Sequence, residues 1–401
     1  MATHIADIEL SEPLTTIVPR HGVANVLALV RWYDRPIGLV RMQTTTGWIS
    51  AKRLQQAIAA QVSWPTEYPD PQLAATQPVS IVVCTHERPD DLERCLDALL
   101  VIAEAGHEVV VVDNAPRSSR TADVVARYPF RYICEPQVGL DNARNAGLRA
   151  ASHALIAYTD DDAVPDARWV DALVQPFTDP NVGCVTGLVL PLELETRAQE
   201  QFEVYCVHRR TFLRQVLSAP HVPPAAAGIA GMGANMAFRR ELVLQLGGFD
   251  PRLDGGTPTC SGGDTDMFAR VLEAGAQIVY TPDAFVWHRH RREMAELRSC
   301  IFGYGVGLYS FLTKRLVESG DRHVLMIAGR WLAGPIVKAA VRRLLGRPTM
   351  SLPLLLMEAQ GACIGPWRLW QATAQLRVFE HRQQREQDTT LNYNLKPRGD
   401  R

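Results

Sequence analysis

Three clusters of polar residues follow apolar runs that are typical of buried strands. Residues 85–88 (THER) follow the run 79–84, Asp113 ends the run 108–113, and Asp160–Asp162 follow the run 154–159. Because ligands of parallel sheets bind beyond the carboxyl ends of the strands, we expect the three clusters to share one edge. Three successive carboxylates need a counter-charge, and Mg²⁺ or Mn²⁺ is the simplest one. The alternative is a solvated acidic turn that caps the next helix.

Strands and helices alternate around these clusters. Apolar runs predict strands at 79–84, 108–113, 130–134, 154–159 and 182–190, with helical spacing between them. Strands that are apolar on both faces and alternate with helices predict a mostly parallel sheet covered by helices. Residues 1–75 are predicted to be a small α+β unit. A proline-containing stretch at 63–77, which overlaps its end, is predicted to be a linker. After residue 291 the chain is predicted to be helical.

Composition excludes several classes of protein. The 401 residues carry 42 basic and 43 acidic side chains, which excludes nucleic-acid binding by bulk charge. The mean hydropathy of −0.07 excludes a polytopic membrane protein. Eight cysteines without a CxxC pair indicate reduced thiols, and the N-terminal MATHIADIELSEPL contains no secretory signal. We therefore expect a cytoplasmic protein.

Residues 79–290 resemble the glycosyltransferase family 2 enzymes of the GT-A fold. The matching segments, in the order and spacing of that family, are VSIVVCTHERPDDLERCLDAL, EVVVVDNAP, VGLDNARNAGLRAASHALIAYTDDDAVP, GANMAFRRELVLQLGGFD and GGDTDMFARVLEAGAQIVYTPDAFVWHRHR. The resemblance implies an inverting enzyme that uses a nucleotide-diphosphate sugar. It implies a Rossmann-like, mostly parallel α/β catalytic domain at 76–292, between the α+β unit 1–75 and a helical region 293–401.

The resemblance also implies roles for the residues at the strand ends. Asp160-Asp161-Asp162 occupies the DxD motif, with Asp160 at the donor ribose or the metal and Asp162 on the cation that bridges the diphosphate. Residues implied in donor binding are Thr85, Glu87, Arg88, Asp113, Gly139, Arg144, Asp160 and Asp161, with Asp113 recognising the base. A guanidinium at Arg144 can neutralise phosphate, and the alternative is a surface pair with Asp141.

Two further segments match the acceptor side and the metal site of the family. Residues 262–266 (GGDTD) match an acidic motif often written Glu-Asp, but Gly263 stands in place of the glutamate. Asp264 is the expected general base that removes the acceptor proton, with Asp266 as the other candidate. The alternative for Asp264 is a helix cap. His288 matches a histidine that completes the metal site, and the alternative is a structural histidine. Residues 231–236 (GMGANM) match the segment that forms the floor of the acceptor site in that family.

The region 301–375 is apolar and basic. Its run 324–341 approaches the length of a membrane span, but Arg330 and Lys338 interrupt it, and a charge near the centre of a bilayer costs at least ~2.5 kcal/mol. We expect helices that lie on the inner membrane surface, attracted by anionic lipid. A helical domain packed on the catalytic core is the alternative. Such peripheral membrane contact would suit a lipid-linked acceptor.

Together these features predict a metal-dependent inverting glycosyltransferase. It would transfer a sugar to a hydroxyl of a glycan or lipid-linked acceptor in cell-surface polysaccharide or glycoconjugate biosynthesis. One alternative is a nucleotidyltransferase on a similar sheet, which would release pyrophosphate. The other is a non-catalytic module that binds a glycan or a nucleotide sugar, and Gly263 is the feature that supports it.

Overall fold

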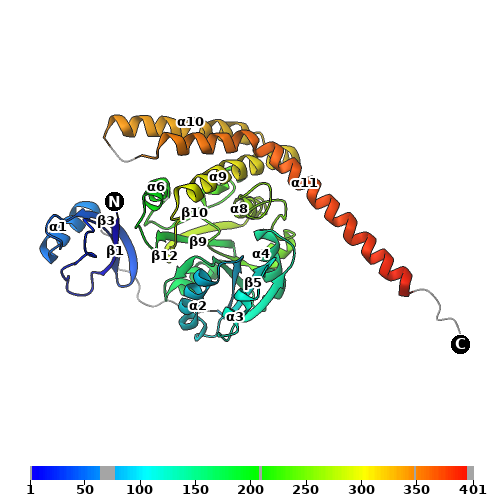
Figure 1. The fold of residues 1–401 in the computed structure, drawn as a ribbon, viewed down its shortest axis with the longest axis horizontal. Coiled ribbons are helices and arrows are strands. Elements are labelled where there is room, and N and C mark those ends of the chain that lie inside the picture. The colour runs from blue at the N-terminus through cyan, green and yellow to red at the C-terminus, as the bar shows by residue number, and fades with distance from the viewer. Residues whose placement is uncertain (1, 64–76, 207–209, 347–348, 395–401) are drawn as a thin grey trace.

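The computed structural model describes residues 2–63, 77–206, 210–346 and 349–394, and the predicted linker falls largely outside these ranges (Figure 1). Within them, a nine-stranded sheet forms the centre of the molecule, a three-stranded sheet lies beside it, and long helices cover its top in the view of Figure 1. The strand order of the central sheet is β10-β12-β9-β11-β7-β4-β5-β6, and β8 pairs with β12.

Six strands of the described central sheet run in the same direction. They are β4 (Val79–Thr85), β5 (Glu108–Asn114), β6 (Arg131–Glu135), β7 (Leu155–Asp160), β9 (Val182–Pro191) and β12 (Gln277–His288). The antiparallel members are β8 (Ala163–Pro165), β10 (Gln215–Leu217) and β11 (Asn235–Arg239). The predicted mostly parallel α/β sheet is confirmed.

Helices cover both faces of this sheet because its strands are apolar on both sides. On β4, Ile81 and Val83 face the helices of one side and Val82 those of the other. The first side carries α2 (Pro89–Ala103), α3 (Arg120–Val125) and α5 (Trp169–Val174), followed by the 3₁₀ turn η1 (Gln175–Thr178). The second side carries α4 (Leu140–Ala150), α7 (Arg240–Gln245), α8 (Gly263–Glu273) and the 3₁₀ turn η3 (Pro224–Ile229).

The N-terminal unit is a three-stranded sheet with one helix. It contains β1 (Thr3–Glu9), β2 (Asn25–Trp32), β3 (Arg35–Gln43) and α1 (Ala51–Gln61). The unit packs on the central sheet through Leu29, which clusters with Leu188 and Phe285. Arg31 donates to Asp166 at 2.8 Å. Strand β1 was not expected from the sequence. Its outer edge bonds to a segment far along the chain, because the Thr3 amide donates to the Leu194 carbonyl at 2.7 Å.

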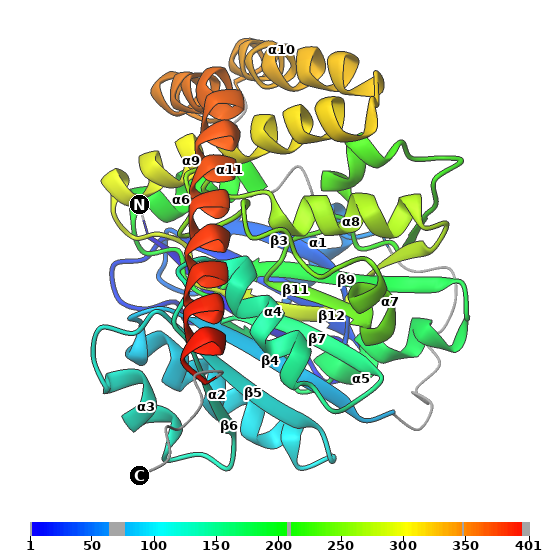
Figure 2. The ribbon, with the colours of Figure 1, turned by 90° about the vertical axis from the view of Figure 1, so that its right-hand side faces the viewer.

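Three long helices form the C-terminal layer: α9 (Met294–Lys314), α10 (His323–Leu344) and α11 (Leu352–Asn394), with a π-helical turn, η4 (Arg315–Ser319), after α9. Helices α9 and α11 pack very closely. A Cβ added to Gly305 would lie 2.0 Å from the Glu358 carbonyl oxygen. Figures 1 and 2 show that α10 lies on the outer side of this layer, while the second half of α11 extends away from it.

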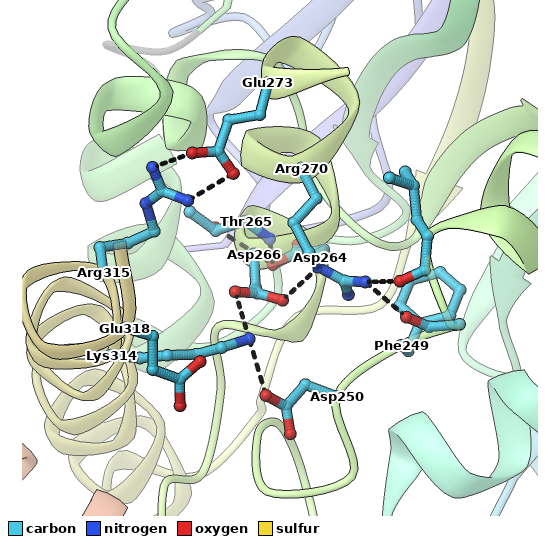
Figure 3. Close-up of polar contacts among 12 residues, drawn as sticks. Phe249, Asp250, Asp264, Thr265, Asp266, Arg270, Glu273, Lys314, Arg315 and Glu318 are labelled. Carbon is cyan, nitrogen blue, oxygen red and sulfur yellow. Dashed lines mark hydrogen bonds and ion pairs between the residues drawn. The ribbon is translucent and has the colours of Figure 1, made fainter. Parts of the chain in front are cut away.

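An ion-pair network joins this layer to the central sheet (Figure 3). The buried ammonium of Lys314 lies 2.7 Å from both Asp250 and Asp266. Arg270 then donates to the second oxygen of Asp266 at 2.8 Å and to the Gly248 carbonyl at 2.7 Å. Since Asp266 lies on α8, two residues after Asp264, this network fixes the helix that carries the candidate base.

Two elements differ from what the sequence pattern alone suggests. The apolar runs 277–280 and 285–287 resemble two separate strands, but they form the single strand β12, with a register shift between Thr281 and Phe285. Helix α6 (Arg197–Cys206) was not expected in a segment that reads as irregular. Its apolar residues, among them Phe202, pack against α9 and α11, which the local sequence cannot indicate.

Candidate active site

Two aspartates and a histidine meet at the carboxyl ends of β7 and β12. Asp160 ends β7, Asp162 follows in the turn, and His288 ends β12, which pairs with β8 through Ala163. One potential ligand atom from each of the three lies within 4.8 Å of the others. The Nε2 atom of His288 lies 3.0 Å from Oδ1 of Asp162. The sequence placed these residues in one cluster, and the structure brings them together.

Positive charge surrounds Asp162 in this cluster. Arg88 lies 3.1 Å and Arg291 3.3 Å from its Oδ2 atom. Burial alone would raise the pKa of Asp162, but His288 and these arginines hold it below its ordinary value. Burial alone would lower the pKa of His288, but the carboxylate of Asp162 raises it. Asp162 is therefore ionised, and it attracts cations on both of its oxygens.

Asp161 has a different environment from its two neighbours. It is buried and accepts a hydrogen bond from the Thr85 hydroxyl at 2.8 Å, and Arg88 lies 3.3 Å away. Burial and the nearby Asp162 raise the pKa of Asp161 to about 7. Burial also raises the pKa of Asp160. The strand-end residues 85–88 and Asp160–Asp162 thus share one edge, as the sequence predicted, but Asp161 contacts protein groups.

The residues expected to bind the nucleotide lie along the same edge. Asp113 is buried, and one of its oxygens accepts from the Tyr132 hydroxyl at 2.9 Å, while the other has no hydrogen-bond partner. Burial raises the pKa of Asp113. Glu87 is exposed and accepts from the Arg117 amide at 2.7 Å. Gly139 has φ +134° and donates its amide to Asn114 at 2.9 Å.

Arg144 lies deeper than the sequence suggested. It pairs with Asp141 at 2.8 Å, as the alternative interpretation held, but also with Asp254 at 2.6 Å, and its side chain is only 4% exposed. The surface location in that interpretation is wrong. Burial raises the pKa of both Asp160 and Asp264, and the charge of the nearby Arg144 opposes this rise in both. Its phosphate-neutralising role stays a prediction.

Asp264 lies on α8 but does not cap it. The cap residue is Gly262, and no side chain caps this helix, so the capping interpretation of Asp264 is wrong. The carboxylate of Asp264 accepts from the Gly233 amide at 2.8 Å and from the Thr265 amide at 2.6 Å. Burial and the nearby Asp254 raise its pKa. A half-buried carboxylate with a raised pKa, held beside a glycine-rich loop, has the properties of a proton acceptor.

The structure explains why residue 263 is glycine. A Cβ added there would lie 2.0 Å from Oδ2 of Asp141, a fully buried oxygen with no hydrogen-bond partner. Any larger residue at 263 would therefore require Asp141 to move. The carboxylate of Asp141, which comes from α4, therefore lies directly against Gly263, next to the residue proposed as the base.

A second pair of residues lies beside the cluster, and its glutamate was missed in the sequence. Glu203 and His290 are buried, their Oε2 and Nε2 atoms lie 3.6 Å apart, and the two Nδ1 atoms of His290 and His288 are 3.5 Å apart. Burial lowers the pKa of His290 to about 4, and Arg210 lowers the pKa of Glu203 to about 2. Glu203 lies on α6, which was not predicted, so no sequence signal pointed to it.

The donor atoms of Asp160, Asp162 and His288 fit a divalent cation. They comprise carboxylate oxygens and one imidazole nitrogen, and the buried Oδ1 of Asp162 lies 3.0 Å from the Nε2 atom of His288, so two of the donor atoms already face each other. His288 is already oriented toward this point by its contact with Asp162.

Comparison with known proteins identifies the family. The sequence model described as "Glycosyltransferase like family 2" matches residues 76–300, which is more than half of the chain. The chain belongs to this glycosyltransferase family. The match covers the central sheet together with α8 and all the candidate residues above. The family predicted from the sequence is therefore confirmed, and with it the class of enzyme.

Two named relatives and one solved structure are similar to this glycosyltransferase. The pre-mycofactocin glycosyltransferase of Mycobacterium tuberculosis is 28% identical over 221 residues, which are 54% of this chain and 44% of that protein. This chain therefore spans less than half of that relative's length. The succinoglycan biosynthesis protein ExoM of Rhizobium meliloti is 27% identical over 259 residues, 62% of this chain and 75% of that protein. The mannosyltransferase PcManGT from Pyrobaculum calidifontis, in complex with GDP-Man and Mn²⁺, has a TM-score of 0.44 and 22% identity, covering 76% of each chain.

Proposed function

We propose that this glycosyltransferase is a metal-dependent, inverting enzyme that transfers a sugar from a nucleotide diphosphate to a hydroxyl group of a glycan or lipid-linked acceptor. The observation that carries the proposal is the cluster of Asp160, Asp162 and His288 at the same sheet edge as Arg88 and Asp113. A bound Mg²⁺ or Mn²⁺ would neutralise the charge that develops on the departing diphosphate.

The protein residues have separate roles in this proposal. Asp113, near the carboxyl end of β5, accepts a hydrogen bond from the base, and Arg88 and Arg291 face the diphosphate. Asp264 takes the proton of the acceptor hydroxyl while that oxygen forms the new bond to the anomeric carbon. The bond from the anomeric carbon to the phosphate oxygen breaks, and the nucleoside diphosphate leaves with the electron pair. Attack from the face opposite the leaving group inverts the anomeric centre.

Thermal shift with nucleoside diphosphates and nucleotide sugars, each with Mn²⁺, Mg²⁺ or chelator, tests the donor site. A ligand that binds only the folded state raises the melting temperature by mass action. We expect one diphosphate to stabilise the protein only with metal, and Asp162→Ala to abolish this shift. The control is Asp90→Ala, which removes an exposed carboxylate at the start of α2 and should keep the shift. Equal shifts in chelator and in metal would contradict the metal site.

Turnover tests the role of Asp264 separately. Asp264→Asn keeps the shape of the side chain but removes the proton acceptor, so we expect turnover to fall by about 10² to 10⁴ with donor binding retained. Full turnover by this variant would remove Asp264 from the base role. Release of pyrophosphate instead of nucleoside diphosphate would identify a nucleotidyltransferase. Donor binding without transfer to any acceptor would favour the non-catalytic module.

Attachment at the cytoplasmic face of a membrane completes the proposal. It is supported by α10, which among the described residues is the only helix long and apolar enough to cross a bilayer. The mean hydropathy of its apolar stretch is 1.5, and 12% of that stretch is buried. Arg330 and Lys338 favour a helix that lies on the membrane surface. Such a location would suit a role in cell-surface polysaccharide or glycoconjugate biosynthesis. We also propose that the chain is divided into domains at 1–75, 76–292 and 293–401.

A further inference from the structure

A cavity of about 670 Å³ lies between α10 and the edge of the central sheet, and it does not include the cluster of Asp160, Asp162 and His288. Most of its wall is apolar, with contributions from Val189, Tyr205, Ile229, Met232, Trp331 and Met350. This volume lies within the roughly 300–1,000 Å³ range of ligand sites, which are mostly apolar with a few placed polar groups. The cavity therefore has the size and the lining of a binding site.

The polar side of this cavity is basic. Among the described residues that line it, four are arginine or lysine and none is aspartate or glutamate. Arg210 is engaged with Glu203. Arg330 and Lys338 are eight residues apart on α10, which brings them to one side of the helix, and Arg342 also lines the cavity. An apolar cavity with a row of cations is complementary to a molecule that has an apolar chain and an anionic group.

The outer side of α10 indicates where such a molecule comes from. Large apolar side chains on this helix are 44% to 88% exposed, among them Leu325, Met326, Leu332, Val337, Val341 and Leu344. A helix with an apolar outer side and several basic residues lies readily in the interface of an anionic membrane. The cavity lies directly under this helix, so a membrane lipid would lie close to it.

One end of the cavity adjoins the candidate base. Gly231 and Met232 line the cavity, and the amide of the next residue, Gly233, donates to Asp264 at 2.8 Å. Gly228 also lines the cavity, and a Cβ there would lie 3.5 Å from a methyl group of Thr265. The loop from η3 to β11 thus forms a thin wall between the cavity and Asp264, and a bound molecule that extends past this loop places its far end beside the base.

We propose that the cavity binds the lipid part of the acceptor, a single long apolar chain that ends in a phosphate or diphosphate. The chain occupies the apolar wall, the phosphate faces the cations of α10, and the hydroxyl-bearing group beyond the phosphate reaches Asp264. This inference rests on the proposed function, because it names the class of acceptor for that reaction. The apolar contacts set the affinity, and the charge contacts select a lipid phosphate over a neutral lipid.

Binding of farnesyl phosphate to the full chain, measured by titration calorimetry without vesicles, tests this proposal. We expect saturable binding that weakens at least tenfold in Ala339→Phe, which fills the cavity, and in Lys338→Glu, which reverses a lining charge. The matched controls are the neighbouring exposed positions Ala340→Phe and Arg343→Glu, which carry the same changes outside the cavity. They should bind within twofold of the wild type. Farnesol should bind at least tenfold more weakly, and inorganic phosphate should not compete.

Other outcomes would overturn the inference. Equal loss in each variant and its control would mean that farnesyl phosphate binds the outer side of α10 and not the cavity. Binding only to phosphatidylglycerol vesicles, without farnesyl phosphate binding, would mean that α10 is a membrane contact alone. Failure of the proposed function is measured separately, because Asp162→Ala should lose the metal-dependent donor shift and keep lipid binding. The cavity variants should show the opposite pattern.

Discussion

Helices α9 and α10 are similar in length and apolar character but lie in different surroundings. Helix α9 has 21 residues and α10 has 22. Apolar residues of α9 such as Leu297, Ile301 and Phe311 are buried, whereas Val324 and Ile327 are the only buried apolar residues among the described side chains of α10. The difference teaches that apolar composition does not determine whether a helix is a core element or a surface for another molecule.

Glycines and charges distinguish the two helices. Gly305 of α9 faces the backbone of α11 at a distance that excludes any side chain, whereas Gly329 of α10 has no atom within 4 Å of an added Cβ. Lys314 at the end of α9 is buried between two carboxylates, whereas Lys338 of α10 is exposed and lines the cavity. Helix α9 is thus fixed to α8 and α11, whereas most of the described side chains of α10 are exposed or only partly buried.

The largest effect is expected at Lys314. Lys314→Met removes the cation between Asp250 and Asp266, and breaking a buried ion pair costs about 3–5 kcal/mol. Arg252 and Arg270 remain as partners of the two carboxylates, so we expect about 3 kcal/mol from urea denaturation. Lys338→Met on α10 is the control and should change the free energy of unfolding by less than about 0.5 kcal/mol. Similar losses in both variants would remove the contrast between the helices.

The dependence of stability on pH tests separately whether Lys314 stabilises the carboxylate of Asp250. Burial would raise the pKa of Asp250, but Arg252 and Lys314 hold it below its ordinary value. A carboxyl group with a depressed pKa contributes stability above its unfolded pKa of about 3.9, and this contribution is lost as pH falls toward the folded pKa. We expect the wild type to lose stability below about pH 4. The loss should be smaller in Lys314→Met, and an identical acid profile would show that Lys314 does not stabilise Asp250.

The second effect is expected at the contact between α9 and α11. Gly305→Ala places a methyl group 2.0 Å from the carbonyl oxygen of Glu358, so the helices must separate. Overpacking of this kind costs about 1–3 kcal/mol. The matched variant Gly329→Ala meets no atom and replaces a helical glycine, so it should stabilise the protein by about 0.5–1 kcal/mol. Thermal denaturation of the two variants should therefore shift in opposite directions, and a fall in both would mean that α10 is packed as α9 is.

The sequence predicted the sheet and its edge better than the helical layer. Strands such as β4 and β7 are buried on both faces, so they appear in the sequence as continuous apolar runs, and the polar residues after them mark the site. The contacts of Arg144 with Asp254 and of Gly263 with Asp141 join residues more than one hundred positions apart, and spacing cannot indicate them. Strand β1 is as long as β4 but mostly only partly buried, so it lacks a continuous apolar run and was not recognised.

The C-terminal helical region also shows that distant contacts cannot be predicted from the local sequence. The sequence left open whether the C-terminal helices pack on the core or lie on a membrane. In the structure α9 packs on the core and α10 exposes its apolar residues, so one description does not apply to the whole region. Apolar residues are present in both helices, and only their burial separates the two.

The smallest effect on stability, and the one that tests α10 as a membrane contact, is expected on its outer side. The double variant Leu332→Gln and Val337→Gln replaces exposed side chains, so the free energy of unfolding should change by less than about 0.5 kcal/mol. Binding to phosphatidylglycerol vesicles, measured by cosedimentation, should weaken about tenfold, which corresponds to about 1.4 kcal/mol. The control is the pair Val18→Gln and Val101→Gln, which are exposed on other elements and should leave vesicle binding unchanged. Equal vesicle binding in both double variants would mean that the apolar side of α10 does not contact lipid. It would leave α10 as a cover over the cavity, still distinct from α9 in having so little of its surface buried.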